Sequence, residues 1–109
     1  MFSEHTDSGY HEVAPGISIK AIAYGERTLM AEFRLARGAK LPEHSHPHEQ
    51  TGYLVSGSMV LRVAGTARLL APGDAWTVPS GAAHGADIID DSVAVEVFSP
   101  VREDYLKYL

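Results

Sequence analysis

An all-β fold, a small sandwich or barrel, is the class that this sequence predicts, on three observations. Short runs rich in β-branched and aromatic residues recur along the chain, and none is long enough to form a stable helix. Residues that favour turns separate these runs at short intervals. The chain has 109 residues, 45% of them hydrophobic and 21% charged, and this composition indicates one globular domain over residues 1–109.

Five runs are expected to form strands because each is enriched in β-forming residues and bounded by turn signals. In chain order these runs are residues 17–22, 28–35, 59–63, 75–78 and 93–98. The turn signals between them are Pro15 with Gly16, Gly25, Gly38, Gly57, Gly65, Pro72 with Gly73, Pro79 to Gly81, and Asp90 with Asp91. Gly38, Gly57, Gly73 and Gly81 are expected to adopt positive φ angles.

The C-terminal tail is the one segment expected to be helical. Ser99 is a favourable N-cap, and Pro100 suits the first position of a helix. Leu106 and Leu109 then follow at a spacing of three residues, which is compatible with a helical face. The sequence therefore predicts one or two helical turns after the last strand.

Charge and cysteine content exclude several function classes. Nine basic residues against 14 acidic residues give a net charge of −5, which argues against an electrostatic nucleic-acid binder. There is no cysteine, so any metal must be held by nitrogen or oxygen ligands. Residues 1–10 contain neither a positive leader nor an apolar run, so we expect no signal peptide, no membrane anchor and a cytoplasmic location.

Three of the six histidines fall within five residues of one another. In an extended segment His44 and His46 project to the same side, where they can hold one cation, and Pro47 favours an extended backbone at His46. Gln50 has the same parity if the strand continues through the proline, and its amide oxygen is a possible ligand. His48 shares that parity too, so parity alone does not choose among the four.

The spacing around these histidines resembles the first motif of the cupins. That motif places a glycine, five residues, His-x-His, three or four residues, an acidic ligand, six residues and a second glycine. Gly38, His44, His46 and Gly57 match it in residues 38–57. The acidic position falls on Gln50, so a neutral glutamine stands where most of the family has glutamate.

A second stretch, residues 73–88, resembles the second cupin motif of a glycine, five residues, Pro-x-Gly, two residues, a histidine, three residues and an asparagine. The final asparagine is replaced by Ile88. Two independent spacing patterns make the resemblance specific. The matching residues are Gly73, Pro79, Gly81 and His84.

The resemblance implies a double-stranded β-helix, or jelly-roll barrel, with one divalent metal ion held by His44, His46, Gln50 and His84. Iron, nickel, zinc, manganese and cobalt all bind such nitrogen and oxygen ligands, and the sequence does not choose among them. A neutral glutamine makes the ion a stronger Lewis acid than a glutamate would. His48 is expected outside the ligand set, because the motif spacing passes over it. The alternative reading is that the histidines are ordinary surface or core residues.

A narrower resemblance links this chain to the pectin-degradation cupins. It rests on the run from His44 to Gln50 and on residues 96–106. Members of that group convert 4,5-unsaturated monouronates, released from pectin or alginate by lyases, into linear ketonised sugars. By position the resemblance adds three pocket residues: Glu96, where the group usually has aspartate, Phe98 and Arg102.

The roles implied for these residues are specific. Arg102 is expected to clamp the substrate carboxylate, Glu96 to move a proton between O1 and C4 as an ionised base, and Phe98 to form an apolar wall. A structural salt bridge between Arg102 and Glu96 is the alternative. Trp76 and Phe33 are expected in the core.

The leading interpretation is therefore a metal-dependent isomerase acting on a small anionic sugar. Two alternatives remain: a quercetinase-like dioxygenase that uses oxygen, and a non-catalytic module that binds a sugar or a metal. Small cupins usually pair through an edge strand or by exchanging N-terminal segments. The resemblance therefore also implies a homodimer.

Overall fold

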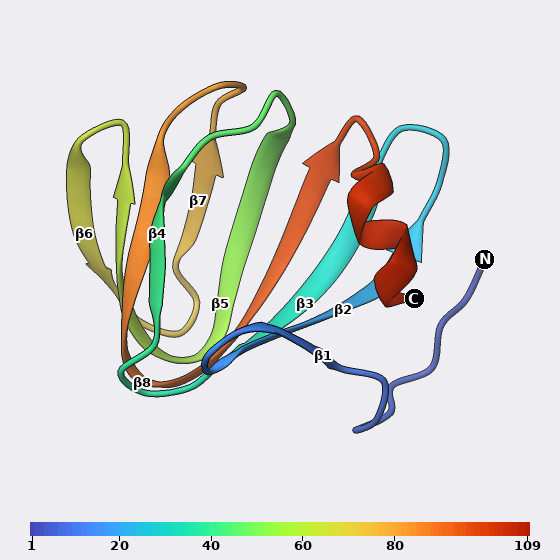
Figure 1. Cartoon of the computed structure of the whole chain (residues 1–109), viewed down its shortest axis with the longest axis horizontal. Helices are drawn as coiled ribbons and strands as arrows, with labels where there is room; N and C mark the ends of the chain where they lie inside the picture. Colours follow the sequence, from blue (N-terminus) through green and yellow to red (C-terminus); the bar gives the residue numbers. More distant parts are fainter.

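The computed structural model describes all 109 residues and consists of eight β-strands and one short 3-10 helix (Figure 1). None of the chain's helices has the length and apolar character needed to cross a membrane. The elements are β1 (His11–Ala14), β2 (Ile17–Tyr24), β3 (Leu29–Leu35), β4 (Lys40–His44), β5 (Glu49–Val63), β6 (Thr66–Leu70), β7 (Ala75–Val78), β8 (His84–Ser99) and η1 (Glu103–Tyr108).

The two longest strands build the barrel. All strand pairs are antiparallel, and the main path of the sheet is β1-β2-β3-β8-β5-β6. The first part of β8 pairs with β4, and its last part pairs with β3. Likewise β5 pairs first with β7 and later with β6. Because β5 and β8 each pass from one set of neighbours to another, the sheet folds over on itself, and the predicted jelly-roll barrel is confirmed.

Alternating side chains supply the core. In β3, residues Leu29, Ala31, Phe33 and Leu35 are buried, whereas the residues between them are not. The same period of two holds in β2, and inward residues of β5 and β8 complete a cluster of 15 buried hydrophobic residues. Phe33 is 7% exposed, in agreement with its predicted core position. Trp76 is only partly buried and packs against the cluster.

Two predicted turns are wrong, because they lie inside long strands. Gly57 is in the middle of β5, and Asp90 with Asp91 lies in β8. The register of β5 against β8 shifts between Leu54 and Met59, so both strands bend there without ending. Gly57 has the expected positive φ, 89°, but it serves a bulge.

Strand lengths also differ from the prediction. The runs expected at residues 59–63 and 93–98 are the last parts of β5 and β8, which begin ten and nine residues earlier at Glu49 and His84. Strands β1, β4 and β6 were not predicted, because their sequences contain few β-branched residues. Residues 75–78 form β7 with the predicted bounds.

The predicted helix start is wrong as well. Ser99 is the last residue of β8 and pairs with Glu49, so it cannot act as an N-cap. The peptide bond between Ser99 and Pro100 is cis. The helical segment η1 begins at Glu103, and its N-cap residue, Arg102, makes no capping hydrogen bond through its side chain. The tail is nevertheless helical, over about two turns of 3-10 geometry.

Candidate metal centre

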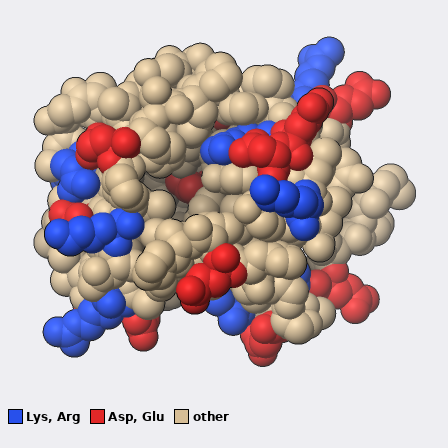
Figure 2. All heavy atoms as spheres, viewed as in Figure 1, with Lys and Arg blue, Asp and Glu red and all other residues tan.

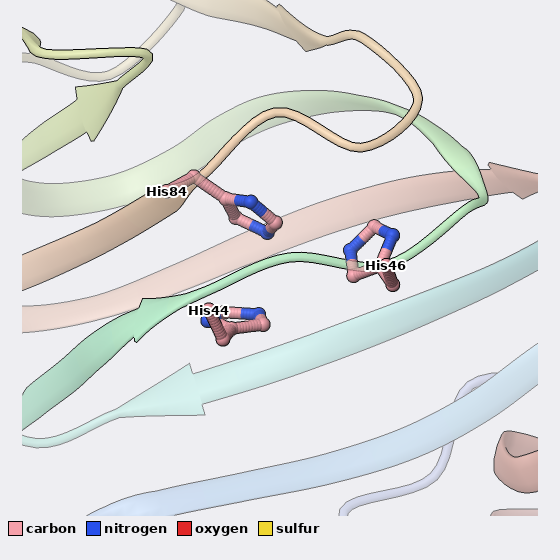
Figure 3. Close-up of side chains that lie close together, drawn as sticks. All are labelled: His44, His46 and His84. Carbon is pink, nitrogen blue, oxygen red and sulfur yellow. The ribbon is translucent and has the colours of Figure 1, made fainter.

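Three histidines from separate parts of the fold converge at one end of the barrel. His44 is the last residue of β4, His84 is the first residue of β8, and the two are cross-strand partners. His46 lies in the turn from β4 to β5. One ring nitrogen of each histidine lies within 4.8 Å of the others, and Figure 3 shows the three rings turned toward a common point. This cluster can hold a metal ion.

The backbone fixes which nitrogen of each ring is free. Nδ1 of every ring contacts a backbone carbonyl two residues away, and a carbonyl oxygen only accepts hydrogen bonds. Nδ1 therefore carries the proton, and Nε2 of the neutral ring keeps its lone pair. The Nδ1 to oxygen distances are 2.9 Å from His44 to Pro42, 3.0 Å from His46 to His48, and 3.0 Å from His84 to Ala82.

Gln50 brings an oxygen to the same place from a different strand than expected. The chain does not continue as one strand through Pro47, because β4 ends at His44 and β5 begins at Glu49. Gln50 is 5% exposed, and its side-chain oxygen lies 3.0 Å from Nε2 of His46. With the His46 proton on Nδ1, these two atoms face each other with lone pairs and no hydrogen between them. A cation bound by both atoms would resolve this arrangement.

Burial keeps two of these imidazoles in the neutral form that a metal requires. It lowers the pKa of both His46 and His84 below the ordinary histidine value. The positive charge of Arg102 lowers the pKa of His46 further. Neutral imidazoles and an amide oxygen fit a divalent cation of the first transition series, without selecting one.

His48 takes part through its backbone only. Its carbonyl oxygen accepts the hydrogen bond from His46, while its half-buried ring has an Nδ1 atom without a partner. The His48 and His46 ring centroids are 5.7 Å apart. The structure thus places the His48 side chain outside the three-histidine cluster.

A cavity of about 60 Å³ extends from this cluster into the barrel. The face of the molecule drawn in Figure 2 is hollowed near its centre, with acidic atoms inside the hollow and side chains of both charge signs around it. Eight of the 14 residues that line the cavity are hydrophobic, so its few polar groups stand out. The polar lining residues are His44, Gln50, His84, Glu96 and Arg102, and the aromatic residues Phe98 and Tyr105 also line the cavity.

Glu96 occupies the inward face of β8, two residues before Phe98. Its Oε1 atom accepts hydrogen bonds from the Gln50 amide and, at 3.1 Å, from Nε1 of Trp76. Burial raises the pKa of Glu96 by more than these donors and Arg102 lower it. Burial thus opposes the ionised form that the expected base role of Glu96 requires.

Arg102 is held by its own segment of chain and forms no ion pair with Glu96. Its Nε and Nη2 atoms donate to the two carboxylate oxygens of Asp104, at 3.2 and 2.7 Å. Its guanidinium carbon lies 3.8 Å from the ring centroid of Tyr105 and 5.1 Å from that of Phe98. The structural alternative of an Arg102–Glu96 salt bridge is not what the structure contains; Asp104 is the partner.

Sequence reasoning missed two residues of this region. Trp76 was expected to be a core residue, and no spacing pattern connects it with Glu96. Tyr105 lies in the tail, where only η1 brings it against Phe33, Phe98 and Arg102. Both contacts depend on strand pairing and tail placement, which residue spacing does not report.

A jelly-roll barrel with imidazole nitrogens gathered at one end of its interior defines a class, the barrels known as cupins. Comparison with known proteins agrees. The profile of the Cupin domain family matches residues 31–100, and the chain belongs to this family.

Three relatives show where in the family the chain lies. It is 31% identical over 102 residues to the pectin degradation protein KdgF of Dickeya dadantii (strain 3937), covering 92% of this chain and 93% of that protein. The structure of KdgF from Halomonas sp. matches with a TM-score of 0.91 and 34% identity, over 95% and 96% of the two chains. An RmlC-like cupin from Shewanella frigidimarina NCIMB 400 matches with a TM-score of 0.90 and 27% identity, over 95% and 94%.

Proposed function

We propose that this protein is a metal-dependent cupin enzyme that opens the ring of 4,5-unsaturated uronate monosaccharides from pectin or alginate breakdown. One observation carries the proposal. A carboxyl group, Glu96, and a guanidinium, Arg102, line the same cavity as His44 and His84. The similarity to the pectin degradation protein KdgF of Dickeya dadantii supports this substrate class.

The metal would be one divalent ion on His44, His46, Gln50 and His84, with iron, nickel, zinc, manganese and cobalt as candidates. When bound, the ion supplies Lewis-acid stabilisation of the negative charge that develops on a substrate oxygen. The protonated Nδ1 atoms orient the three imidazoles for this role, and the hydrogen bond that the Gln50 amide donates to Glu96 orients Gln50.

Arg102 binds the substrate carboxylate in this proposal. Asp104 occupies the guanidinium edge formed by Nε and Nη2, which leaves the edge containing Nη1 free for a second carboxylate. The Tyr105 ring supports the guanidinium plane from one side. This arrangement fixes the orientation of an anionic sugar at the mouth of an otherwise apolar cavity, with Phe98 as one wall.

Glu96 accepts and donates the protons that move during the reaction. In the isomerisation the C1–O5 bond breaks, the C1 hydroxyl loses its proton to form a carbonyl, C5 becomes a ketone and C4 gains a proton. No atom is gained or lost overall. The raised pKa of Glu96 suits a group that both accepts the proton from O1 and delivers one to C4.

The test is an ultraviolet assay of a 4,5-unsaturated galacturonate monomer, following the loss of its double-bond absorbance. Metal-loaded wild-type protein should clearly exceed the spontaneous rate, whereas Arg102→Ala should fall close to it. A wild-type rate equal to the reaction without protein would contradict the proposal. Oxygen consumption with aromatic substrates would then indicate a dioxygenase, and binding without turnover a non-catalytic module.

We also propose that two copies pair as a homodimer through the outer face of β8. The residues facing out from this strand near its end are Val93, Val95 and Val97, so its outer face is apolar, as in strands that are covered on that side. Tyr53 and Val55 of neighbouring β5 extend this face and are 50% and 48% exposed. Sedimentation should show a dimer for the wild type and a monomer for Val95→Lys.

A further inference from the structure

A glycine stands between two functional side chains on three neighbouring strands. Gly52 of β5 is the cross-strand partner of Trp76 on β7 and of Glu96 on β8. The three positions share the inward face of the sheet, at the level of the cavity. Any side chain at the middle position would separate the other two.

The absence of a side chain at Gly52 lets the indole of Trp76 lie across β5. A Cβ atom at Gly52 would collide with Cε2, Cζ2 and Nε1 of this indole. With that space open, Nε1 of Trp76 reaches Oε1 of Glu96 at 3.1 Å. Gly52 does not have a positive φ, so its backbone does not require glycine, and the space above it is the reason for a residue without a side chain.

We propose that Trp76 is a positioning residue for Glu96 and that Gly52 is the gap through which it acts. This inference rests on the proposed function, in which Glu96 moves protons. Trp76 does not line the cavity, so it reaches the reacting atoms only through Glu96. The indole N–H and the Gln50 amide both donate to Oε1. The other oxygen, Oε2, therefore remains available to the substrate.

To position Glu96, Trp76 must donate a hydrogen bond from its indole N–H, and the size of its ring is not what matters. A buried carboxyl group with donors on one oxygen only is held in a single orientation, because rotation would leave those donors unpaired. Losing one of the two donors frees the group to turn. A displacement of a reacting group by about 1 Å can reduce the rate about 100-fold.

The first experiment compares kinetics in three metal-loaded variants. Trp76→Phe keeps an aromatic ring but removes the N–H, and Gly52→Ala keeps the indole but displaces it. Both should lower kcat by about 10- to 100-fold, with KM within about twofold and bound metal unchanged. Gly25→Ala is the matched control, because a Cβ there meets nothing within 4 Å, and it should behave as wild type.

The second experiment needs no substrate, so it separates this inference from the proposed function. The chain has one tryptophan, so the zinc-loaded protein gives one indole N–H resonance in a ¹H–¹⁵N spectrum. That resonance should move upfield in Glu96→Ala, which removes the acceptor. An unmoved resonance would overturn the inference, as would wild-type kcat in Trp76→Phe. If Trp76→Phe does not fold, Gly52→Ala decides in its place.

Discussion

The three imidazoles of the site are prepared for a cation by hydrogen bonds within two residues of each ring. His44 and His84 donate to carbonyls that precede them, and His46 donates to one that follows. This geometry is a property of the local chain and not of any bound ion. It also means that protonating Nε2 of His46 or His84 would place a charge in a partly or fully buried position.

The metal-free protein should therefore lose stability in mild acid. The pKa values of His46 and His84 are lowered in the fold, whereas in the unfolded chain they lie near 6.5. As pH falls through about 6.5, the unfolded chain binds protons that the folded chain does not, so the free energy of unfolding decreases until the folded pKa values are passed. Urea unfolding of chelator-treated protein at about pH 7.5, 6.5 and 5.5 measures this.

His84→Asn is the control for this prediction. Because asparagine does not titrate, the variant should show a weaker dependence of stability on pH over the same range. A pH dependence of the His84→Asn variant as steep as that of the wild type would contradict the assigned direction of the His84 shift.

The choice of glutamine at position 50 follows from its neighbour Glu96. The Gln50 amide donates to that carboxyl group, and a glutamate there would bring two acids together. Gln50→Glu should lower the free energy of unfolding of the metal-free protein by about 1–3 kcal/mol. Adding Glu96→Gln exchanges the two groups and should recover most of this loss, as measured by a double-mutant cycle in urea. A double variant no more stable than Gln50→Glu would rule out this coupling.

At the scale of elements, the bend in β5 is the feature that brings both ends of this strand into different parts of the barrel. Gly57 forms this bulge with φ of 89°, and a Cβ there would collide with Ser92 and the carbonyl of Asp91. Gly65 has a similar φ of 84°, but a Cβ there meets nothing within 4 Å. Comparing the two positions therefore separates the cost of backbone strain, which both share, from the cost of steric collision, which arises only at Gly57.

Gly57→Ala should therefore destabilise the protein by about 1–3 kcal/mol more than Gly65→Ala does. Both variants incur the cost of a left-handed alanine, so the difference measures the collision with β8. Urea unfolding of the two variants side by side checks it. Equal losses would show that β8 yields to the added methyl group at no cost.

At the scale of elements, the sequence predicts those strands and turns whose own residues have a clear preference for that structure. Residues 75–78 form β7 as expected, because their composition and the following proline define both ends. The bend at Asp90 and Asp91 looks like a turn, because polar residues favour turns, yet pairing with β5 keeps them in β8. Ser99 fails as a helix cap for the same reason. Long-range pairing overrides local preference in each case.

The metal site is predictable in part. Two histidines at an interval of two residues, with a third after a Pro-x-Gly turn, give the cluster, because the motif spacing encodes its geometry. The role of Trp76 could not be predicted, because it depends on which strands neighbour β5 and on the empty space above Gly52. The only signal in the sequence is that Trp76 and Glu96 both occupy inward-facing positions of their strands. This signal is informative only when the order of the strands in the sheet is known.

At the scale of the whole molecule, a bound ion would join segments that are distant in the chain. The ligands come from the end of β4, the turn after it, the start of β5 and the start of β8. An ion that binds only the folded protein stabilises it by about 2.7 kcal/mol at 100 times its dissociation constant. Thermal unfolding should shift upward with added divalent metal in the wild type but not in His84→Ala. An equal shift in both would place the ion elsewhere.

The most direct test of the whole account measures the rate of uronate double-bond loss against the amount of divalent metal bound per chain. Chelator-treated protein should react at the spontaneous rate. The rate should rise in proportion to bound metal and level off at one ion per chain. His84→Ala, titrated in the same way, should stay at the baseline. A wild-type rate that remains at the spontaneous value when one ion is bound, or that is already high without metal, would contradict the account.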